Sequence, residues 1–272
     1  MTSKLIPANP SAVSVIRKVT PNITTISAPF KRVGLFKIGG RGTIVRLSSG
    51  ALAVFSPTAL TPEVREVVTS LGNKVSYIAA LDFEHHIFLG EWHKAFPEAK
   101  VIGPEGLPEK RTAQKNEAVP FAFVFTQENK AGLKIGEEFD SDFDYEYVGS
   151  HGNKEIVFNY KPDKTLIQAD LLWNLPATEQ YSRAGESATT GILSSIFSAL
   201  LTTSGSAIWQ KRFSWYAASG KDRPGFNASV QRIATWDFTK IIPCHGDVIE
   251  IDGNAVFKKV FAWHLEPTAA KQ

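Results

Sequence analysis

The sequence predicts an α/β (α+β) protein in which two mixed β-sheets pack face to face and helices cover both outer faces, an αββα sandwich. Three observations indicate it: a series of short strands near the start, strands alternating with helices after it, and a second series of strands that leads through helices to a last strand and a closing helix. We expect residues 31–272 to form a single domain and residues 1–30 to be an N-terminal segment that lies over the surface.

The first strands are predicted in RVGLFKIGGRGTIVRLSSGALAVFSP, where short runs rich in Val, Ile and Phe are separated by glycine pairs. Ser49 and Gly50 are typical of a hairpin turn between TIVRL and ALAVF. The residues before this segment are polar and contain Pro7, Pro10 and Pro21, which is why we place them on the surface. GGRG lacks the strand-loop-helix context of a dinucleotide-binding motif.

The next segments alternate between helix and strand. LTPEVREVVTSLG predicts a helix, with Thr61 as its N-cap, Pro62 in its first turn and Gly72 at its end. VSYIAAL then predicts a strand, HIFLGEWHKAF a helix and AKVIGP another strand. This alternation is typical of βαβ units with parallel strands.

A second series of strands is predicted in YEYVGS, KEIVFNY and KTLIQADLLW, with turns at HGN and KPD. Residues from about 176 to 235 are rich in Ser, Ala and Thr and contain the apolar GILSSIFSALL and the aromatic IWQKRFSWYAA, so we expect a helical insertion there. TKIIPCHGD predicts the last strand and NAVFKKVFAWHL the closing helix.

Composition excludes several classes of protein. The hydrophobic content of 43% and charged content of 21% are ordinary for a globular protein, and a net charge of +3 is too small to favour nucleic acid. The single cysteine, Cys244, excludes an internal disulfide and fits a reducing compartment. Without an apparent signal peptide or membrane span, we expect a cytoplasmic protein whose partner is a small-molecule substrate, not a membrane.

One stretch, IAALDFEHHIFLGEW, contains a group of carboxylate and imidazole side chains between two apolar segments. It contains Asp82, Glu84, His85 and His86 within five residues, and charged side chains beside apolar elements are costly unless they are paired or bind a metal. Three further candidates stand where predicted strands end: His151, Asp170 and His245. Each alone is more often a hydrogen-bonded structural residue than a ligand, but strand ends are where α/β folds place their sites.

On these residues the sequence resembles the metallo-β-lactamase-fold superfamily, in particular its fungal branch of uncharacterised proteins, from about Val33 onward. The leading motif of that superfamily is His-x-His-x-Asp-His. Ala80 stands in the first position of the motif, Asp82 in place of the second His, Glu84 in place of the Asp, and His85 matches the last His.

Further along the chain, His151 matches the lone His of the superfamily, Asp170 its bridging Asp and His245 its final His. The resemblance therefore implies metal ligation by Asp82, Glu84, His85, His151, Asp170 and His245, with Glu84 and Asp170 also in catalytic roles.

Three departures from the superfamily pattern bear on that ligand set. Without the first His, the site built from three imidazoles cannot form in its usual way. Ser56 stands near the position where the family often has an Asp that supports the ligands. An alternative register makes His86 the ligand and His85 its neighbour.

The expected cofactor is one or two divalent ions, Zn, Fe or Mn, because imidazole and carboxylate ligands suit all three. The resemblance implies a metal-dependent hydrolase-like enzyme that uses a metal-activated water on a small molecule. Two alternatives stay open: a diiron or manganese oxidoreductase or oxygen-handling protein, and a non-catalytic ligand-binding member of the fold. The aromatic part of the helical insertion either covers the site as a lid or packs as core.

Overall fold

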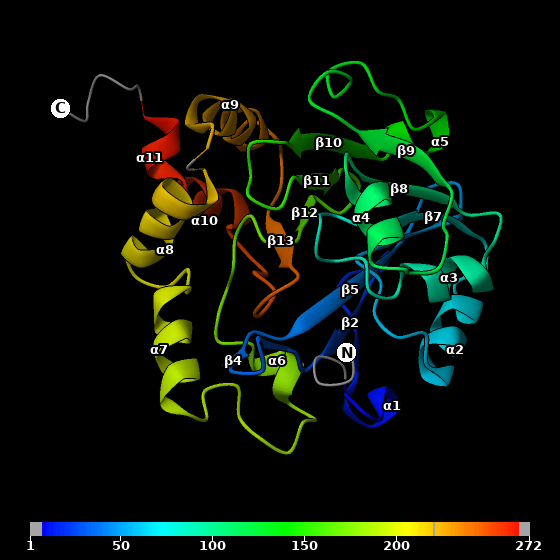
Figure 1. Ribbon diagram of the computed structural model, residues 1–272, viewed down its shortest axis with the longest axis horizontal. Coiled ribbons are helices and arrows are strands. Elements are labelled where there is room, and N and C mark those ends of the chain that lie inside the picture. Colours follow the sequence, from blue (N-terminus) through cyan, green and yellow to red (C-terminus); the bar gives the residue numbers. More distant parts are fainter. Residues whose placement is uncertain (1–6, 220, 267–272) are drawn as a thin grey trace.

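The two-sheet sandwich predicted from the sequence is present in the computed structural model, which describes residues 7–219 and 221–266 (Figure 1). One sheet has seven strands and the other has four, and helices lie on the outer face of each. The fold class is therefore the αββα sandwich. None of the described helices is long and apolar enough to cross a membrane.

The seven-stranded sheet has the order β1-β2-β5-β6-β7-β8-β9. Neighbours from β1 to β6 are antiparallel, and those from β6 to β9 are parallel, as the alternation of helix and strand predicts. A two-stranded hairpin, β3 with β4, stands apart from it. The strands are β1 (Val15–Lys18), β2 (Ile23–Ala28), β3 (Lys31–Arg32), β4 (Phe36–Lys37), β5 (Gly40–Arg46), β6 (Leu52–Phe55), β7 (Val75–Ala79), β8 (Lys100–Pro104) and β9 (Phe121–Phe125).

The four-stranded sheet has the order β10-β11-β12-β13, formed by β10 (Phe143–Val148), β11 (Glu155–Tyr160), β12 (Thr165–Gln168) and β13 (Lys240–Pro243). The first three strands are antiparallel, whereas β12 and β13 are parallel. Because β12 and β13 run the same way, the loops after them leave from the same edge of the sheet.

The layers follow from the alternation of side chains along each strand. In β7, Tyr77 and Ala79 pack into the core between the two sheets, whereas Ile78 between them packs under the helices that follow β6, β7 and β8. On the far side, Val157 of β11 packs against Phe226 and Phe257 of two later helices. Three apolar layers thus join helices, sheet, sheet and helices.

The helices of the first half are α1 (Pro10–Val13), α2 (Pro62–Ser70), α3 (Leu89–Ala95), α4 (Leu107–Ala113) and α5 (Glu137–Asp140). The expected start of α2 is confirmed: the Thr61 hydroxyl accepts the N–H of Val64, and Pro62 occupies its first turn. The predicted hairpin turn before Ala51 is also present, since Gly50 donates its N–H to Leu47.

The expected helices between residues 176 and 235 are α6 (Thr178–Tyr181), α7 (Ile192–Leu200), α8 (Ile208–Phe213), the π-helical turn η1 (Ser214–Ala218) and α9 (Arg223–Ala234). The closing helix is divided into α10 (Gly253–Val260) and α11 (Ala262–Leu265). A single continuous helix would place His264 at the surface. The structure instead buries His264, and its ring forms hydrogen bonds with Ser214 and Asn227.

The N-terminal residues differ from expectation. Residues 1–6 lie outside the described residues, but β1 and β2 are strands of the large sheet, not a segment over its surface. Ile23 and Ile26 of β2 are buried on opposite faces, Ile23 between the sheets and Ile26 under the helices. Of the prolines that suggested a surface segment, Pro7 and Pro10 precede β1 and Pro21 lies in the turn between β1 and β2.

Candidate metal centre

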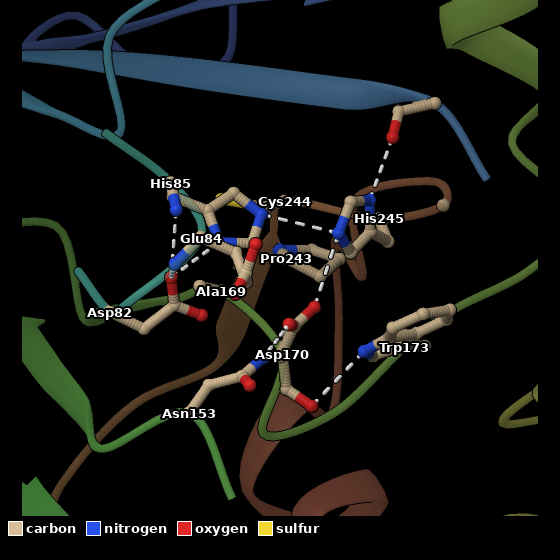
Figure 2. A network of polar contacts seen from close by, with 12 residues as sticks. Asp82, Glu84, His85, Asn153, Ala169, Asp170, Trp173, Pro243, Cys244 and His245 are labelled. Carbon is tan, nitrogen blue, oxygen red and sulfur yellow. Dashed lines mark hydrogen bonds and ion pairs between the residues drawn. The ribbon is translucent and has the colours of Figure 1, made fainter. Parts of the chain in front are cut away.

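Three side chains from separate loops meet at one edge of the sandwich. His85 lies in the loop after β7, and Asp170 and His245 follow the parallel strands β12 and β13. Figure 2 shows the three side chains pointing toward one another from these loops. The parallel pairing brings Asp170 and His245 together, and the packing of the two sheets adds His85.

The distances between the three side chains suit a single divalent ion. The Nε2 atoms of His85 and His245 are 3.2 Å apart, and Nε2 of His245 is 3.1 Å from Oδ1 of Asp170. One ligand atom from each residue lies within 4.8 Å of the others. Two ligands of a tetrahedral zinc site, each bound at about 2.0–2.1 Å, are about 3.3 Å apart. The residues present therefore fit a metal.

The hydrogen bonds of the two imidazoles fix which nitrogen is free. Nδ1 of His85 lies 2.8 Å from the carboxylate oxygen Oδ1 of Asp82, and Nδ1 of His245 lies 2.7 Å from the carbonyl oxygen of Gly39. Both oxygens accept, so each Nδ1 carries the proton and each Nε2 has a free lone pair. This support is the one that metal-binding histidines usually have.

The site therefore calls for a positive charge. In these tautomers two Nε2 lone pairs face each other at 3.2 Å, and Oδ1 of Asp170 is buried without a hydrogen-bond partner. Unpaired acceptors in a buried site are costly. Either a proton on one imidazole or a metal ion among the three ligands relieves them.

The pKa values at the site also favour a positive charge among the three side chains. Burial alone would lower the pKa of His85, but the charges of Asp82 and Asp170 outweigh it and raise that pKa well above its ordinary value. Burial would raise the pKa of Asp170, but its contact with His245, whose Nε2 is 3.1 Å away, and the nearby His85 and His151 hold that pKa below its ordinary value. The carboxylates thus stabilise a cation at this place.

Asp170 is held on both sides. Asn153 donates its Nδ2 hydrogen to Oδ2 of Asp170 over 2.5 Å, and the Trp173 indole donates to its carbonyl oxygen over 3.0 Å. The buried Glu155 carboxylate accepts the N–H groups of Ala169 and Asp170 over 2.7 and 2.8 Å. Burial raises the pKa of Glu155, as do the nearby carboxylates. These contacts leave only Oδ1 of Asp170 free for the cluster.

The remaining predicted ligands from the first motif lie elsewhere. Asp82 is fully buried behind His85, where its Oδ1 also accepts the N–H groups of Glu84 and His85, and its Oδ2 has no partner. The Glu84 carboxylate is half-exposed and lies 2.8 Å from Nζ of Lys110. The structure therefore does not bring Glu84 into the cluster, because the turn fixed by Asp82 directs it outward.

The two other histidines near the cluster have different surroundings. His86 faces Arg111, whose Nη1 is 3.2 Å from its Nδ1, and burial followed by the charge of Arg111 lowers the pKa of His86 to about 4. His151 is buried beside the cluster but not among its three ligands, and its Nδ1 accepts the N–H of Asn153. Burial lowers the pKa of His151.

Two positions of the superfamily pattern have no ligand role here. Ala80, in the place of the first motif His, is buried in the apolar layer under the helices. Ser56, in the place of the supporting Asp, is buried with no hydrogen-bond partner for its hydroxyl. The described residues thus contain a single three-ligand cluster.

The loop that carries His245 depends on residues that sequence reasoning missed. Arg41 donates from Nη1 to the carbonyl oxygens of Pro243 and Gly246, both over 2.6 Å, and so holds the loop on either side of His245. Gln180 bonds to the Cys244 carbonyl and to the Gly246 N–H. The one sequence feature that could have indicated this loop is Gly39. Its φ is +67°, in the left-handed region, and a Cβ at this position would collide with Gln180.

A cavity of about 450 Å³ opens beside the cluster. It is bounded by the β3–β4 hairpin, by the loops that carry the site, and by helices α7 and α8 with η1. Its lining residues are Arg32, Val33, Phe36, His151, Gly152, Asn153, Asp170, Trp173, Phe197, Phe213, Ala217 and Ala218. Asp170 is the one residue of the cluster that lines this space, so the cavity adjoins the cluster.

This sandwich with a site at its edge is the metallo-β-lactamase fold. Solved metallo-β-lactamases share it: the enzyme from Hirschia baltica has 14% sequence identity and a TM-score of 0.58, and the match covers 94% of this chain and 99% of that one. The enzyme from Pontibacter korlensis has 11% identity and a TM-score of 0.56, over 93% and 100%. The metallo-β-lactamase DIM-1, in a crystal exposed to ceftazidime, has 14% identity and a TM-score of 0.58, over 92% and 96%.

Within that fold, the chain belongs to the family described as a domain of unknown function, DUF4336, which matches residues 32–181. The matched segment includes His85 and Asp170 of the cluster, and His245 lies beyond it. No curated protein matches the sequence. Identities as low as those above carry the fold alone, so function rests on the site itself.

Proposed function

We propose that this protein is a metal-dependent hydrolase-like enzyme with one divalent ion held by His85, Asp170 and His245. The observation that carries the proposal is the meeting of two imidazole lone pairs and one unpartnered carboxylate oxygen within 4.8 Å. Three protein ligands leave a coordination position open, as in catalytic zinc sites. We attribute the restriction to one ion to Ala80, which replaces the first imidazole of the superfamily motif.

The chain supplies binding and orientation in this proposal. Asp82 and Gly39 keep the protons of His85 and His245 on Nδ1, and Asn153 occupies the second oxygen of Asp170. A bound divalent ion supplies a Lewis acid and lowers the pKa of its water toward 7. The Glu84 carboxylate has no part in the proposed chemistry, because it lies with Lys110.

The cavity favours a small, largely apolar substrate with a ring or chain that packs on aromatic groups. Phe36, Trp173, Phe197 and Phe213 line its walls, and Arg32 at its edge suits an acidic group. His151 also lines it and carries its proton on Nε2, because its Nδ1 accepts a hydrogen bond. We further propose that the helical insertion from about 176 to 235 covers the substrate.

A second function follows from the ligand types alone. Two histidines and one carboxylate are also the donor set of non-haem Fe(II) sites that react with oxygen. An iron-dependent oxygen-handling protein is therefore the alternative to the hydrolase. With Zn²⁺ the three residues would support hydrolysis, and with Fe²⁺ they would support a reaction with oxygen.

Reloading with defined metals separates these functions. Protein stripped with a chelator is reloaded anaerobically with Zn²⁺, Mn²⁺ or Fe²⁺ and assayed on a panel of aryl esters, thioesters and lactams, with oxygen consumption followed in parallel. The proposal expects metal-dependent hydrolysis that is lost in Asp170→Asn and kept in Asp237→Asn, which alters an exposed carboxylate paired with Lys164. Oxygen consumption only with Fe²⁺ would favour the alternative, and hydrolysis that persists in stripped protein would refute both.

A further inference from the structure

The exposed apolar side chains of this protein gather on one segment. We call residues 192–218, which form α7, α8 and η1, the helical arm. Of the eleven large apolar side chains exposed in the described parts of the chain, seven lie on this arm. They include Ile192 at 80% exposure, Trp209 at 50% and Tyr216 at 71%. Exposed apolar side chains that concentrate on one segment in this way point to an interaction site.

The arm is inverted relative to an ordinary surface helix. Along α7 the serines Ser194 and Ser198 are buried, whereas Ile192, Leu193 and Ile196 are exposed. Along α8 the same holds, since Gln210 is buried beside the exposed Trp209. Helices that cover a core normally place apolar residues inward and polar residues outward. The outward apolar face therefore has a purpose other than packing within this chain.

Hydrogen bonds hold the arm in this orientation. The Ser194 hydroxyl accepts the N–H of Lys37 and donates to the carbonyl oxygen of Leu35, which ties α7 to the β3–β4 hairpin. Gln210 accepts the N–H of Trp173 and donates to the Thr202 carbonyl, which ties α8 to the loop after Asp170. Rolling the helices to bury their apolar face would break these buried hydrogen bonds.

The tip of the hairpin extends the apolar surface. Val33 is 70% exposed and Leu35 is 57% exposed, and the hairpin lies against α7, where the rings of Phe36 and Phe197 are 4.8 Å apart (Figure 1). We call the exposed apolar side chains of the hairpin and the helical arm together the apolar patch. The cavity beside the metal centre opens between the same elements.

The charged residues within the segments that form the apolar patch are all basic. From Ser187 to Lys221 the sequence contains no Asp or Glu, and neither does the hairpin from Lys31 to Lys37. Arg32 and Arg212 are exposed there, and the Arg212 guanidinium lies 4.6 Å from the centre of the Trp209 ring. Lys31 and Lys37 pair with Glu186 at the border of the patch. The patch is thus apolar with a positive rim.

We propose that the apolar patch docks this protein on an anionic lipid bilayer surface. Apolar side chains interleaved with Trp, Tyr and Arg, without carboxylates, suit the boundary between headgroups and acyl chains. A second copy of this chain fits less well, because a two-fold contact through the patch would bring its arginines against their own copies. None of the described helices could span a membrane, but a segment that lies on the membrane surface does not need to span it.

Vesicle flotation tests this directly. Purified protein is mixed with vesicles of phosphatidylcholine alone or with about 30% phosphatidylserine, at low and high ionic strength. The proposal expects binding that requires the anionic lipid and weakens with salt. The double variant Ile192→Ser with Ile196→Ser should lower partitioning on the order of tenfold or more, and Arg212→Glu about tenfold.

Ile251→Ser is the matched control, because Ile251 is 73% exposed outside the patch, in the segment before α10. It should bind vesicles as the unaltered protein does. Absence of binding to every vesicle, or equal binding by the patch variants, would overturn the proposal. A dimer in light scattering that becomes a monomer in the double variant, without vesicle binding, would assign the patch to self-association instead. The test needs no metal and is independent of the proposed function.

Discussion

The Nε2 atoms of His85 and His245 lie 3.2 Å apart although the two residues are separated by 160 positions in the sequence. Each ring is fixed from behind, His85 by the Asp82 carboxylate and His245 by the Gly39 carbonyl. Both anchors are part of buried structure, so the gap between the two nitrogens is set by the fold. A pair of acceptors fixed this closely is preorganised for a cation.

Asp82→Asn should weaken metal binding without unfolding the protein. The asparagine keeps the shape of the side chain but removes the negative charge that supports His85, and loss of such a partner typically costs roughly 10–100-fold in affinity. Zinc titration against a competing chromophoric chelator measures the change.

Glu84→Gln is the control for that experiment, because Glu84 is two positions away and bonds to Lys110 at the surface. We expect zinc affinity within about twofold of the unaltered protein, since exposed ion pairs contribute little. A loss equal to that of Asp82→Asn would mean that Glu84 reaches the metal, as the superfamily motif implied.

Gly39→Ala should destabilise the fold and the metal centre together. A Cβ at this position, where φ is +67°, would collide with the buried Gln180, and its displacement would disturb the loop that holds His245. Gly185→Ala isolates the backbone effect, because φ is +71° there and the space around its Cβ is open.

We expect Gly185→Ala to lower the free energy of unfolding by about 1 kcal/mol and Gly39→Ala by about 2–4 kcal/mol, since overpacking adds about 1–3 kcal/mol. Urea unfolding of the metal-free protein measures both. Only Gly39→Ala should also weaken zinc binding. Equal stability losses in the two variants would show that the contact with Gln180 has no consequence.

Arg41→Met should be among the most destabilising single substitutions. Arg41 is buried, and it binds the carbonyl oxygens of Pro243 and Gly246 and the Glu179 carboxylate. Removing one partner of a buried charged network costs about 3–5 kcal/mol. Arg46→Met, on the same strand but exposed, should change stability by less than about 0.5 kcal/mol in the same thermal unfolding experiment.

The fold was predictable because its elements are short and locally patterned. A short apolar run predicts β7, and Thr61 with Pro62 predicts the start of α2, since both signals act within a few residues. The strands β1 and β2 were missed because buried polar residues mask them: Thr25 and Ser27 lie in the sheet with 0% exposure. Such burial depends on partners distant in sequence.

The candidate site was predictable in part for the same reason. Strand ends and residue types point to His151, Asp170 and His245, and the resemblance to the superfamily motif adds His85. The parallel pairing of β12 with β13 fixes only where the loops of Asp170 and His245 meet. The sequence does not show in which direction the Glu84 side chain points, because that direction depends on a turn closed by the buried Asp82 side chain. The hydrogen bond from His245 to the Gly39 carbonyl was also unpredictable. Every residue has a backbone oxygen, and the sequence does not show which of them accepts from a side chain.

The most direct test of the metal centre is the zinc stoichiometry of protein that has been stripped and then titrated calorimetrically, confirmed by elemental analysis after dialysis. We predict one equivalent of tightly bound zinc for the unaltered protein and for His93→Gln, which alters a histidine of α3 outside the cluster. Folded Asp170→Asn should lose nearly all of it, because the one free carboxylate oxygen of the cluster is gone. Full zinc occupancy in folded Asp170→Asn, or none in the unaltered protein, would contradict the assignment of His85, Asp170 and His245 as a metal site.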